Sequence, residues 1–293
     1  TVYGLAGSAF NEQAIQKIFQ LKNRPICNPL ILHTYCISEV SKFVKEIPPN
    51  ALKLAEAFWP GPLTLLLPKK SIIPHSVTSG SHLVAVRIPN HRVTLDLLKQ
   101  LDFPLVAPSA NPYTRISPTN SKMVDEYFGD TLPCILEGDI CAKGIESTIV
   151  GFHDNAPVIY RQGAISVDAI EFIAGKSKVL ATVKERATTP GMSPMHYAPR
   201  TRFQIVDCIS NFIIQNPILH IGVLTLGKTA IEQPNTTCIH LSIMRDLEEA
   251  SANLYKSMYE LDGMELDCII IERFPEVGIG KSLNDRISRA SYR

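Results

Sequence analysis

The sequence lacks an excess of charge of either sign, and it lacks long apolar runs. Its 293 residues contain 29 Lys and Arg against 28 Asp and Glu, a formal net charge of +1. Strong autonomous binding of nucleic acid needs a clustered basic surface, so this balance argues against it. No apolar run reaches the ~18 residues of a membrane-spanning helix. We expect a globular protein that does not span a membrane, in which a few local cations could still bind a small anion.

Cysteine is present, but not in a pattern that stabilises a fold. The seven cysteines are odd in number and include no CxxC pair, so neither a disulfide framework nor a zinc site is indicated. The eight histidines show no metal-ligand spacing. We therefore predict a protein of the reducing cytoplasm that holds no metal with its own side chains.

Length and periodicity predict two domains, since a domain has roughly 100–200 residues. Over 1–175, short strand-like runs are interrupted by helical patterns, which predicts an α/β fold with a twisted, mixed sheet; one of these strands is expected near 133–137. Residues 176–202 are polar and contain three prolines, which predicts a linker. Alternating strand and helix patterns then predict a small Rossmann-like α/β domain over 203–293.

Residues 21–33, LKNRPICNPLILH, place two cations, an amide and an imidazole in one short segment. Lys22 alone is explained by a solvated helix end, where a cation interacts favourably with the helix dipole. That interpretation explains less well Arg24, which is restricted by the following proline, and Asn28. From these residues alone, a solvated helix end and the wall of an anion site are equally supported.

Other segments carry weaker signals. Arg87 interrupts the apolar run VAVRIP, either in a core ion pair, at the exposed end of a strand, or as a fork for a carboxylate or phosphate. In VAPSANPYTRISPT, Ser109 and Ser117 follow a strand, as in an ordinary turn or a phosphate cradle. GIESTI and VIYRQGA add Ser147 and Arg161.

Taken in order, these motifs resemble a YrdC-type domain. Its two-part signature, K-x-R and S-x-N, stands here as Lys22-Asn23-Arg24 and Ser109-Ala110-Asn111, and the later TPGMSPMHYAP segment with the last domain resembles the longer Sua5-type members. The resemblance implies a YrdC-like twisted mixed sheet with helices around a positively lined cavity. Family members usually carry Pro-Thr-Glu before T-V-Y-G, so we expect residues to be missing ahead of Thr1. The motifs are TVYGL, KNRPICNPLILH, FWPGPLTLLLP, VAVRIP, APSAN, GIESTIV and IYRQGAIS.

The resemblance implies a nucleotidyltransferase that makes threonylcarbamoyl-AMP and pyrophosphate from L-threonine, bicarbonate and ATP, the ATP carrying Mg2+. It further implies that a downstream threonylcarbamoyl transferase complex uses the product to modify adenosine 37 of tRNAs that read ANN codons. We expect contact of this chain with RNA to be weak or indirect.

The resemblance also implies roles residue by residue, with Lys22 and Arg24 as catalytic residues that neutralise phosphate charge. Implied threonine contacts are Thr1, His33, Arg87, Ala107 and Ser147. Implied ATP contacts are Arg24, Asn28, Leu83, Ser109, Ser117, Arg161 and Tyr197.

Two alternatives compete with this interpretation. A hydrogenase-maturation enzyme contains a related domain, but it adds an acylphosphatase unit and Cys-rich zinc motifs that are absent here. The stronger alternative is a non-catalytic RNA- or nucleotide-binding protein with a YrdC-like cavity.

Overall fold

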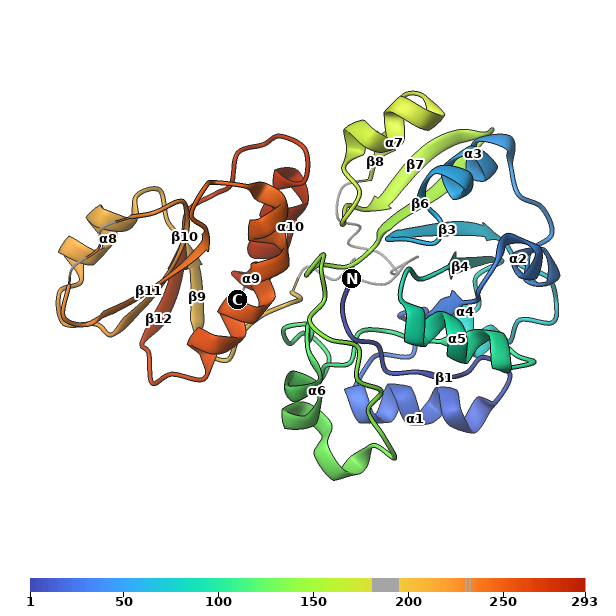
Figure 1. Ribbon diagram of the computed structural model, residues 1–293, viewed down its shortest axis with the longest axis horizontal. Helices are drawn as coiled ribbons and strands as arrows, with labels where there is room; N and C mark the ends of the chain where they lie inside the picture. The colour runs from blue at the N-terminus through green and yellow to red at the C-terminus, as the bar shows by residue number, and fades with distance from the viewer. Residues whose placement is uncertain (181–194, 230, 232, 293) are drawn as a thin grey trace.

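The computed structural model describes residues 1–180, 195–229, 231 and 233–292. They form two domains, each built on its own sheet (Figure 1). The first sheet has eight strands in the order β1-β5-β2-β4-β3-β6-β7-β8 and mixes parallel and antiparallel pairs. The second has four strands in the order β11-β10-β12-β9, all paired in parallel. Both predicted α/β folds are confirmed.

The first domain contains short elements, and its sheet continues through β8 into the predicted linker; residues 181–194 of that linker lie outside the described residues. Its strands are β1 (Gly7–Ser8), β2 (Ile31–His33), β3 (Leu63–Pro68), β4 (Leu83–Arg87), β5 (Leu105–Val106), β6 (Thr148–His153), β7 (Ala156–Arg161) and β8 (Lys178–Val179). Its helices are α1 (Glu12–Lys22), α2 (Ile37–Phe43), α3 (Pro49–Phe58), α4 (His75–Thr78), α5 (Arg92–Gln100), α6 (Ser121–Phe128) and α7 (Val167–Ala174), with a 3-10 turn η1 (Gly129–Thr131).

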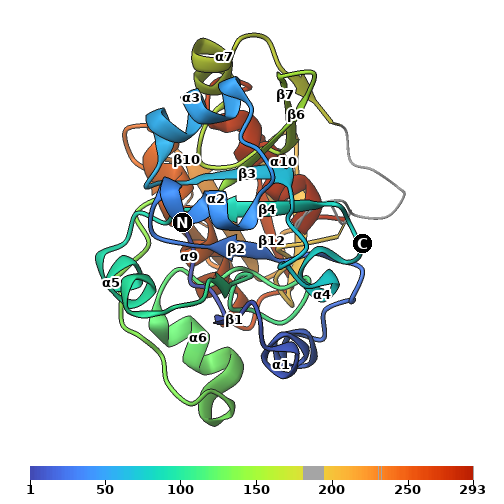
Figure 2. The ribbon, with the colours of Figure 1, turned by 90° about the vertical axis from the view of Figure 1, so that its right-hand side faces the viewer.

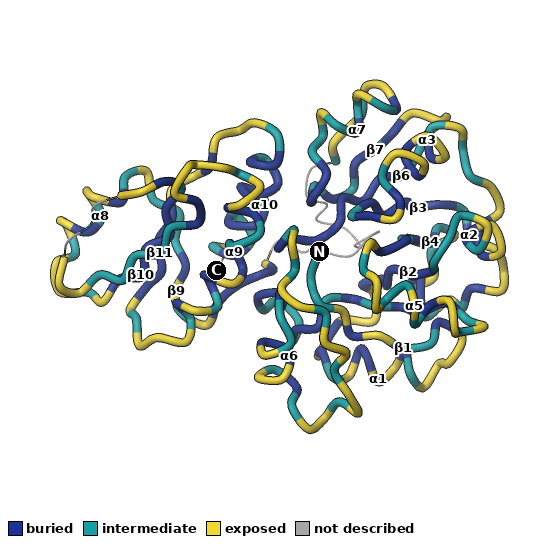
Figure 3. Tube along the Cα trace, viewed as in Figure 1, coloured by how far each residue is buried: buried dark blue, intermediate teal, exposed yellow. Residues whose placement is uncertain are grey.

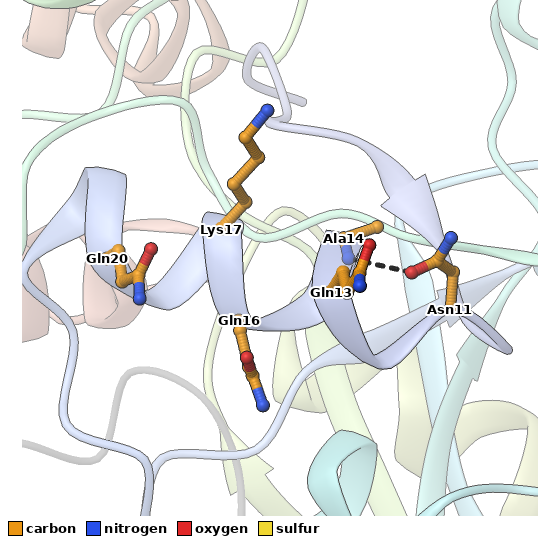
Figure 4. A pocket seen from close by; sticks show the side chains of 6 residues that line it. All are labelled: Asn11, Gln13, Ala14, Gln16, Lys17 and Gln20. Carbon is orange, nitrogen blue, oxygen red and sulfur yellow. Dashed lines mark hydrogen bonds between the residues drawn. The ribbon is translucent and has the colours of Figure 1, made fainter.

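Helix α1 shows how local sequence sets the element that carries Lys22. The Asn11 side chain accepts a hydrogen bond from the Ala14 amide at 3.0 Å and caps the helix start. Asn23 ends the helix in the left-handed conformation, with φ of 50°. The polar face of α1 lines a surface hollow of about 430 Å³ (Figure 4).

The prediction of a strand near residues 133–137 is wrong. This segment is an irregular loop in which Leu136 is 52% exposed, so its apolar residues do not share one buried face. The neighbouring Gly138 amide bonds the Tyr3 hydroxyl at 3.0 Å, which fixes the loop without a strand partner.

The two faces of the first sheet differ, because successive strand residues point to opposite sides. Leu32, Val84 and Val86 point into the large core shared with α1, α2, α3 and α7. The opposite face has only a small apolar cluster, which includes Ile31 and Ala85. His33 follows Ile31 by two residues and Arg87 follows Ala85 by two, so both lie on this second face. Figure 2 shows the strands stacked from β7 to β1.

The second domain presents one helical layer to the first domain (Figure 1). Its sheet packs α9 and α10 on one face and α8 on the other. Buried residues follow the central strands β10 and β12 and parts of α9 and α10 (Figure 3). Within the described residues, no helix has the length and apolar character to cross a bilayer. The elements are β9 (Arg202–Ile205), α8 (Ile209–Gln215), β10 (Ile221–Leu226), β11 (Thr236–Ser242), α9 (Leu247–Asp262), β12 (Cys268–Ile271) and α10 (Gly280–Ala290).

Candidate active site

Lys22 joins the two parts of the K-x-R and S-x-N signature. It is 1% exposed, and its Nζ donates to the Ser109 carbonyl and the Asn111 carbonyl, each at 2.5 Å. Burial lowers the pKa of Lys22, and the nearby charge of Arg24 lowers it further. The solvated helix end is therefore the wrong interpretation of this residue, because the ammonium lies under the S-x-N loop and fixes its backbone.

Arg24 forms a compact unit with the loop that follows it. Its Nη2 donates to the Asn28 Oδ1 at 2.7 Å and to the Pro29 carbonyl at 2.8 Å, and its Nε donates to the Asn28 carbonyl at 3.1 Å. Burial lowers the pKa of Arg24 to about 10, so the group stays charged at neutral pH. The turn from Arg24 to Pro29 thus brings a buried guanidinium and an amide together, as the anion-site interpretation requires.

His33 and Arg87 are register partners on the parallel strands β2 and β4. Arg87 donates from Nε to the Gly61 carbonyl at 3.0 Å and from Nη1 to the Thr1 Oγ1 at 2.7 Å. Gly61 is required in this turn, since a Cβ there would lie 2.1 Å from the Phe58 carbonyl oxygen. Burial lowers the pKa of Arg87 to about 10.

The imidazole of His33 is neutral. Burial and the charge of Arg87 lower the pKa of His33 to about 3. Its Nδ1 lies 3.1 Å from the Ile31 carbonyl oxygen. Because a carbonyl only accepts hydrogen bonds, Nδ1 carries the proton and Nε2 is an acceptor.

Ser147 and Arg161 form a second polar group on the same domain. The Arg161 Nη2 donates to the Ser147 carbonyl at 2.8 Å and to its Oγ at 3.0 Å. The Ser147 Oγ also lies 2.7 Å from the Thr64 Oγ1. The charge of Arg161 lowers the pKa of both Arg24 and Arg87, so Arg161 lies within electrostatic reach of both guanidinium groups.

The backbone places Ala107 and Leu83 at different ends of this region. The Ala107 amide donates to the Ile31 carbonyl at 3.2 Å, so it lies beside the strand that carries His33. Leu83 begins β4, four residues before Arg87 on the same face, and is therefore about 13 Å from it along the strand.

Tyr197 lies between the two domains. It is 1% exposed, adopts a left-handed backbone with φ of 65°, and its hydroxyl has no partner among the described residues. Sequence reasoning missed its neighbour His196, whose ring centroid lies 4.0 Å from that of Tyr197. Burial and the charges of Arg24 and Lys22 lower the pKa of His196, so it lies within their electrostatic reach.

Sequence reasoning also missed Glu146, the residue before Ser147. Its carboxylate is buried, and its Oε1 accepts from the Ser117 hydroxyl at 2.7 Å. Burial alone would raise the pKa of Glu146, but Arg286 and Arg161 hold it below its usual value. The signal that could have identified Glu146 is that it is the one acidic residue in the stretch GIESTIV.

Three of the buried cations have only neutral oxygen partners in the described part of the chain. Lys22, Arg24 and Arg87 donate to carbonyl, amide and hydroxyl oxygens, and none forms an ion pair with a described carboxylate. A buried charge without a counter-charge is unfavourable. Buried charged donors of this kind can bind a carboxylate or a phosphate. The hollow on α1 contains none of these residues (Figure 4).

Both domains match known families. Residues 1–163 match the family model that joins Sua5, YciO and YrdC, described as "Telomere recombination". Residues 165–291 match the model described as "Threonylcarbamoyl-AMP synthase, C-terminal domain".

Individual relatives match over nearly the whole chain. The threonylcarbamoyl-AMP synthase of Pyrococcus abyssi is 34% identical over 99% of this chain and 88% of its own. That of Bacillus subtilis is 34% identical over 99% of this chain and 87% of its own. The crystal structure of Pyrococcus abyssi Sua5 complexed with L-threonine superimposes with a TM-score of 0.90 at 34% identity, covering 99% of this chain and 88% of that one.

Proposed function

The chain belongs to the Sua5/YrdC family of threonylcarbamoyl-AMP synthases, which are nucleotidyltransferases, and from that premise we propose that its buried cationic site joins L-threonine, bicarbonate and ATP. The products are threonylcarbamoyl-AMP and pyrophosphate. One observation carries the proposal: Lys22, Arg24 and Arg87 are buried cations bonded to neutral oxygens. Anionic substrates would supply the counter-charge that no described residue provides to these groups.

The threonine half of the site contains Arg87 and His33. The Arg87 guanidinium would pair with the threonine carboxylate, and the acceptor Nε2 of His33 would receive a hydrogen bond from the amine or hydroxyl group. A neutral imidazole adds no positive charge beside Arg87, so the amine can remain uncharged and nucleophilic. The other residues we assign to threonine are Thr1, Ala107 and Ser147. The threonine-bound relative supports this choice of substrate.

The nucleotide half is built around Arg24 and the S-x-N loop. Arg24 and Asn28 already form one hydrogen-bonded unit, and Lys22 fixes the backbone that carries Ser109. We assign Arg24 and Lys22 to charge stabilisation at the phosphates. The remaining ATP contacts that we propose are Asn28, Leu83, Ser109, Ser117, Arg161 and Tyr197.

The proposed reaction needs no protein nucleophile. The threonine amine first adds to bicarbonate with loss of water, which gives an N-carboxy group on threonine. That carboxylate attacks the α-phosphorus of ATP, and the bond between the α- and β-phosphates breaks to release pyrophosphate. The chain contributes by holding the reactants in line and by placing cations where negative charge shifts.

We propose that Mg2+ enters with ATP. The ammonium and guanidinium groups of the site suit phosphate oxygens but cannot ligate Mg2+, which prefers oxygen ligands, so the polyphosphate itself would hold the ion. When bound to the polyphosphate, the ion offsets negative charge there. Arg24 and Lys22 would stabilise the negative charge on the phosphate oxygens that the ion does not bind.

The product is a mixed anhydride that hydrolyses readily, which supports prompt use by a downstream threonylcarbamoyl transferase complex acting on adenosine 37 of tRNAs that read ANN codons. The net charge of +1 supports only weak or indirect contact between this chain and RNA. The seven free thiols support a cytoplasmic location.

Pyrophosphate release from the purified chain tests this function. We expect release only when threonine, bicarbonate and Mg2+-ATP are present together, and we expect threonylcarbamoyl-AMP by mass spectrometry. Binding of nucleotide or RNA without release under these conditions would instead support the non-catalytic alternative.

A further inference from the structure

The second domain is packed closely against the first. Both contribute to one apolar cluster, in which Ile116, Ile145 and Ala164 of the first domain pack with residues of α9 and α10. Gly144 makes the approach possible: its φ is 68°, and a Cβ would lie 2.3 Å from the Ser251 carbonyl oxygen. The interface therefore lies directly beside the residues that lead into Glu146 and Ser147.

An ion pair lies inside this interface. The Arg286 side chain of α10 is fully buried, and its Nε donates to the Glu146 Oε2 at 2.9 Å. Its other nitrogens donate to the Asp285 carboxylate at 2.6 Å and to the Gln162 carbonyl at 2.7 Å. Planar guanidinium geometry suits several oxygens at fixed angles, so Arg286 fixes Glu146 in one orientation.

The fixed carboxylate in turn orients Ser117. The Ser117 hydroxyl donates to Glu146 Oε1, while the Tyr255 hydroxyl donates to Oε2 at 3.0 Å. A hydroxyl whose hydrogen is committed to a carboxylate presents its lone pairs outward. Ser117 is therefore set as an acceptor, which suits a ribose hydroxyl or an adenine amine better than a phosphate oxygen.

The same two residues of the second domain hold Tyr197. The ring of Tyr255 stacks on that of Tyr197, with centroids 5.6 Å apart and an interplanar angle of 25°. The Arg286 guanidinium carbon lies 4.9 Å from the Tyr197 ring centroid, within cation–π range. Two contacts from one domain thus fix the position of a side chain assigned to ATP.

We propose that Arg286 is a positioning residue for the nucleotide half of the site, acting through Glu146 on Ser117 and directly on the ring of Tyr197, with Tyr255 in support. The second domain then completes the ATP site from outside it. This inference rests on the proposed function, because that function assigns Ser117 and Tyr197 to ATP. A purely structural ion pair would join the domains without distinguishing ATP from threonine.

The test uses the full-length double variant Glu146→Gln/Arg286→Met, which removes both charges and leaves neither one buried alone. We expect the KM for ATP to rise ~10-fold, the effect of losing one charge-assisted hydrogen bond, with the KM for threonine within about twofold of wild type. An unchanged KM for ATP, or equal rises for both substrates, would overturn the inference.

Two single variants complete the design. Glu248→Ala breaks the exposed Lys143–Glu248 pair at 2.9 Å on the rim of the same interface and should leave both KM values unchanged. Tyr255→Phe keeps the aromatic stack but removes one hydrogen bond to Glu146, and should raise the KM for ATP by about threefold. If the double variant fails to fold, Tyr255→Phe decides: a KM for ATP equal to that of Glu248→Ala would reject the inference.

Calorimetric titration with a non-hydrolysable ATP analogue separates this inference from the proposed function. If the wild-type protein releases no pyrophosphate, the proposed function is wrong. The affinities of wild type and variants for the analogue can still be measured and compared in that case. A ~10-fold weaker affinity of the double variant supports the positioning role. Equal affinities reject it whether or not the wild type turns over.

Discussion

The candidate active site and the domain interface both bury cations, but the groups that surround these cations differ. At the interface, Arg286 pairs with Glu146 and Asp285; burial alone would lower the pKa of Arg286, and the groups around it, these two carboxylates included, raise it instead. In the site, burial lowers the pKa of Arg24 and of Arg87 to about 10, and their described partners are neutral. Paired charge thus stands at the docked interface between the domains, whereas cations with only neutral partners among the described residues stand where we propose that the substrates bind.

The largest expected difference between the two regions is in stability. Arg286→Met should lower the free energy of unfolding by ~3–5 kcal/mol, because it leaves the Glu146 carboxylate buried without its partner. Arg24→Met and Arg87→Met should lower it less, by ~1–3 kcal/mol, because each leaves buried carbonyl or hydroxyl acceptors unsatisfied but removes a charge that has no carboxylate partner among the described residues. Urea unfolding of the full chain measures all three.

The exposed interdomain pair provides the matched control for this series. Lys143→Met removes a cation that is 44% exposed and should cost within ~1 kcal/mol. If Arg24→Met destabilised the chain as much as Arg286→Met, the distinction between paired and unpaired buried cations would be refuted.

Ligand affinity should show the reverse pattern. Arg87→Met should weaken threonine binding ~100-fold, and Arg24→Met should weaken binding of an ATP analogue by about the same factor, since each loses a charged contact to its own ligand. The crossed combinations should change less than about threefold. Isothermal titration of both variants with both ligands measures the four values.

The exposed Lys17 on α1 is the control for these titrations, because it is a cation outside the proposed site. Lys17→Met should alter neither affinity. A swapped pattern, with Arg87→Met affecting mainly the ATP analogue, would overturn the division of the site into two halves.

The α/β character of the first domain and the helix that ends at Lys22 could be predicted from the sequence, because helix boundaries depend on local signals. The cap at Asn11 and the proline after Arg24 bracket α1. The strand prediction for 133–137 failed because an apolar run does not show whether a partner strand exists. Resemblance supplied the site residues, and the strand register that pairs His33 with Arg87 agrees with assigning both to one ligand.

The hydrogen-bond partners of Lys22 and Arg286 could not be predicted, because they lie far away in the sequence. Lys22 bonds carbonyls 87 and 89 positions away, and Arg286 bonds a carboxylate 140 positions away. No local pattern identifies such partners. Glu146 is visible beside Ser147 in the sequence, but its burial and its partner in the second domain are not.

Acid should destabilise the chain through the site. The pKa of His33 is lowered from 6.5 to about 3, so between these pH values the unfolded chain binds a proton that the folded chain does not. Stability therefore falls as pH falls through this window, by at most ~1.4 kcal/mol per pH unit from this group. The difference in unfolding free energy between wild type and His33→Gln isolates it, since contributions common to both cancel.

Arg87→Met tests the cause of this lowered pKa. The charge of Arg87 helps to lower the pKa of His33, so the folded-state pKa should rise in the variant. The pH range over which His33 destabilises the chain should then begin at a higher pH than about 3 and be narrower than in wild type. An NMR titration that placed the wild-type His33 near 6.5 would contradict the buried, neutral imidazole.

The smallest expected effect concerns the one apolar difference between threonine and serine. Charged contacts to the shared carboxylate cannot distinguish these amino acids, and a single methyl contact supplies only ~1–3 kcal/mol. We expect L-serine to bind ~10-fold more weakly than L-threonine. The ratio should be the same in wild type and in Arg87→Met, although both affinities fall, because Arg87 would contact the carboxylate that the ligands share. Equal affinities would show that the methyl group lacks an apolar contact, and a ratio that changed in the variant would show that Arg87 acts on more than the carboxylate.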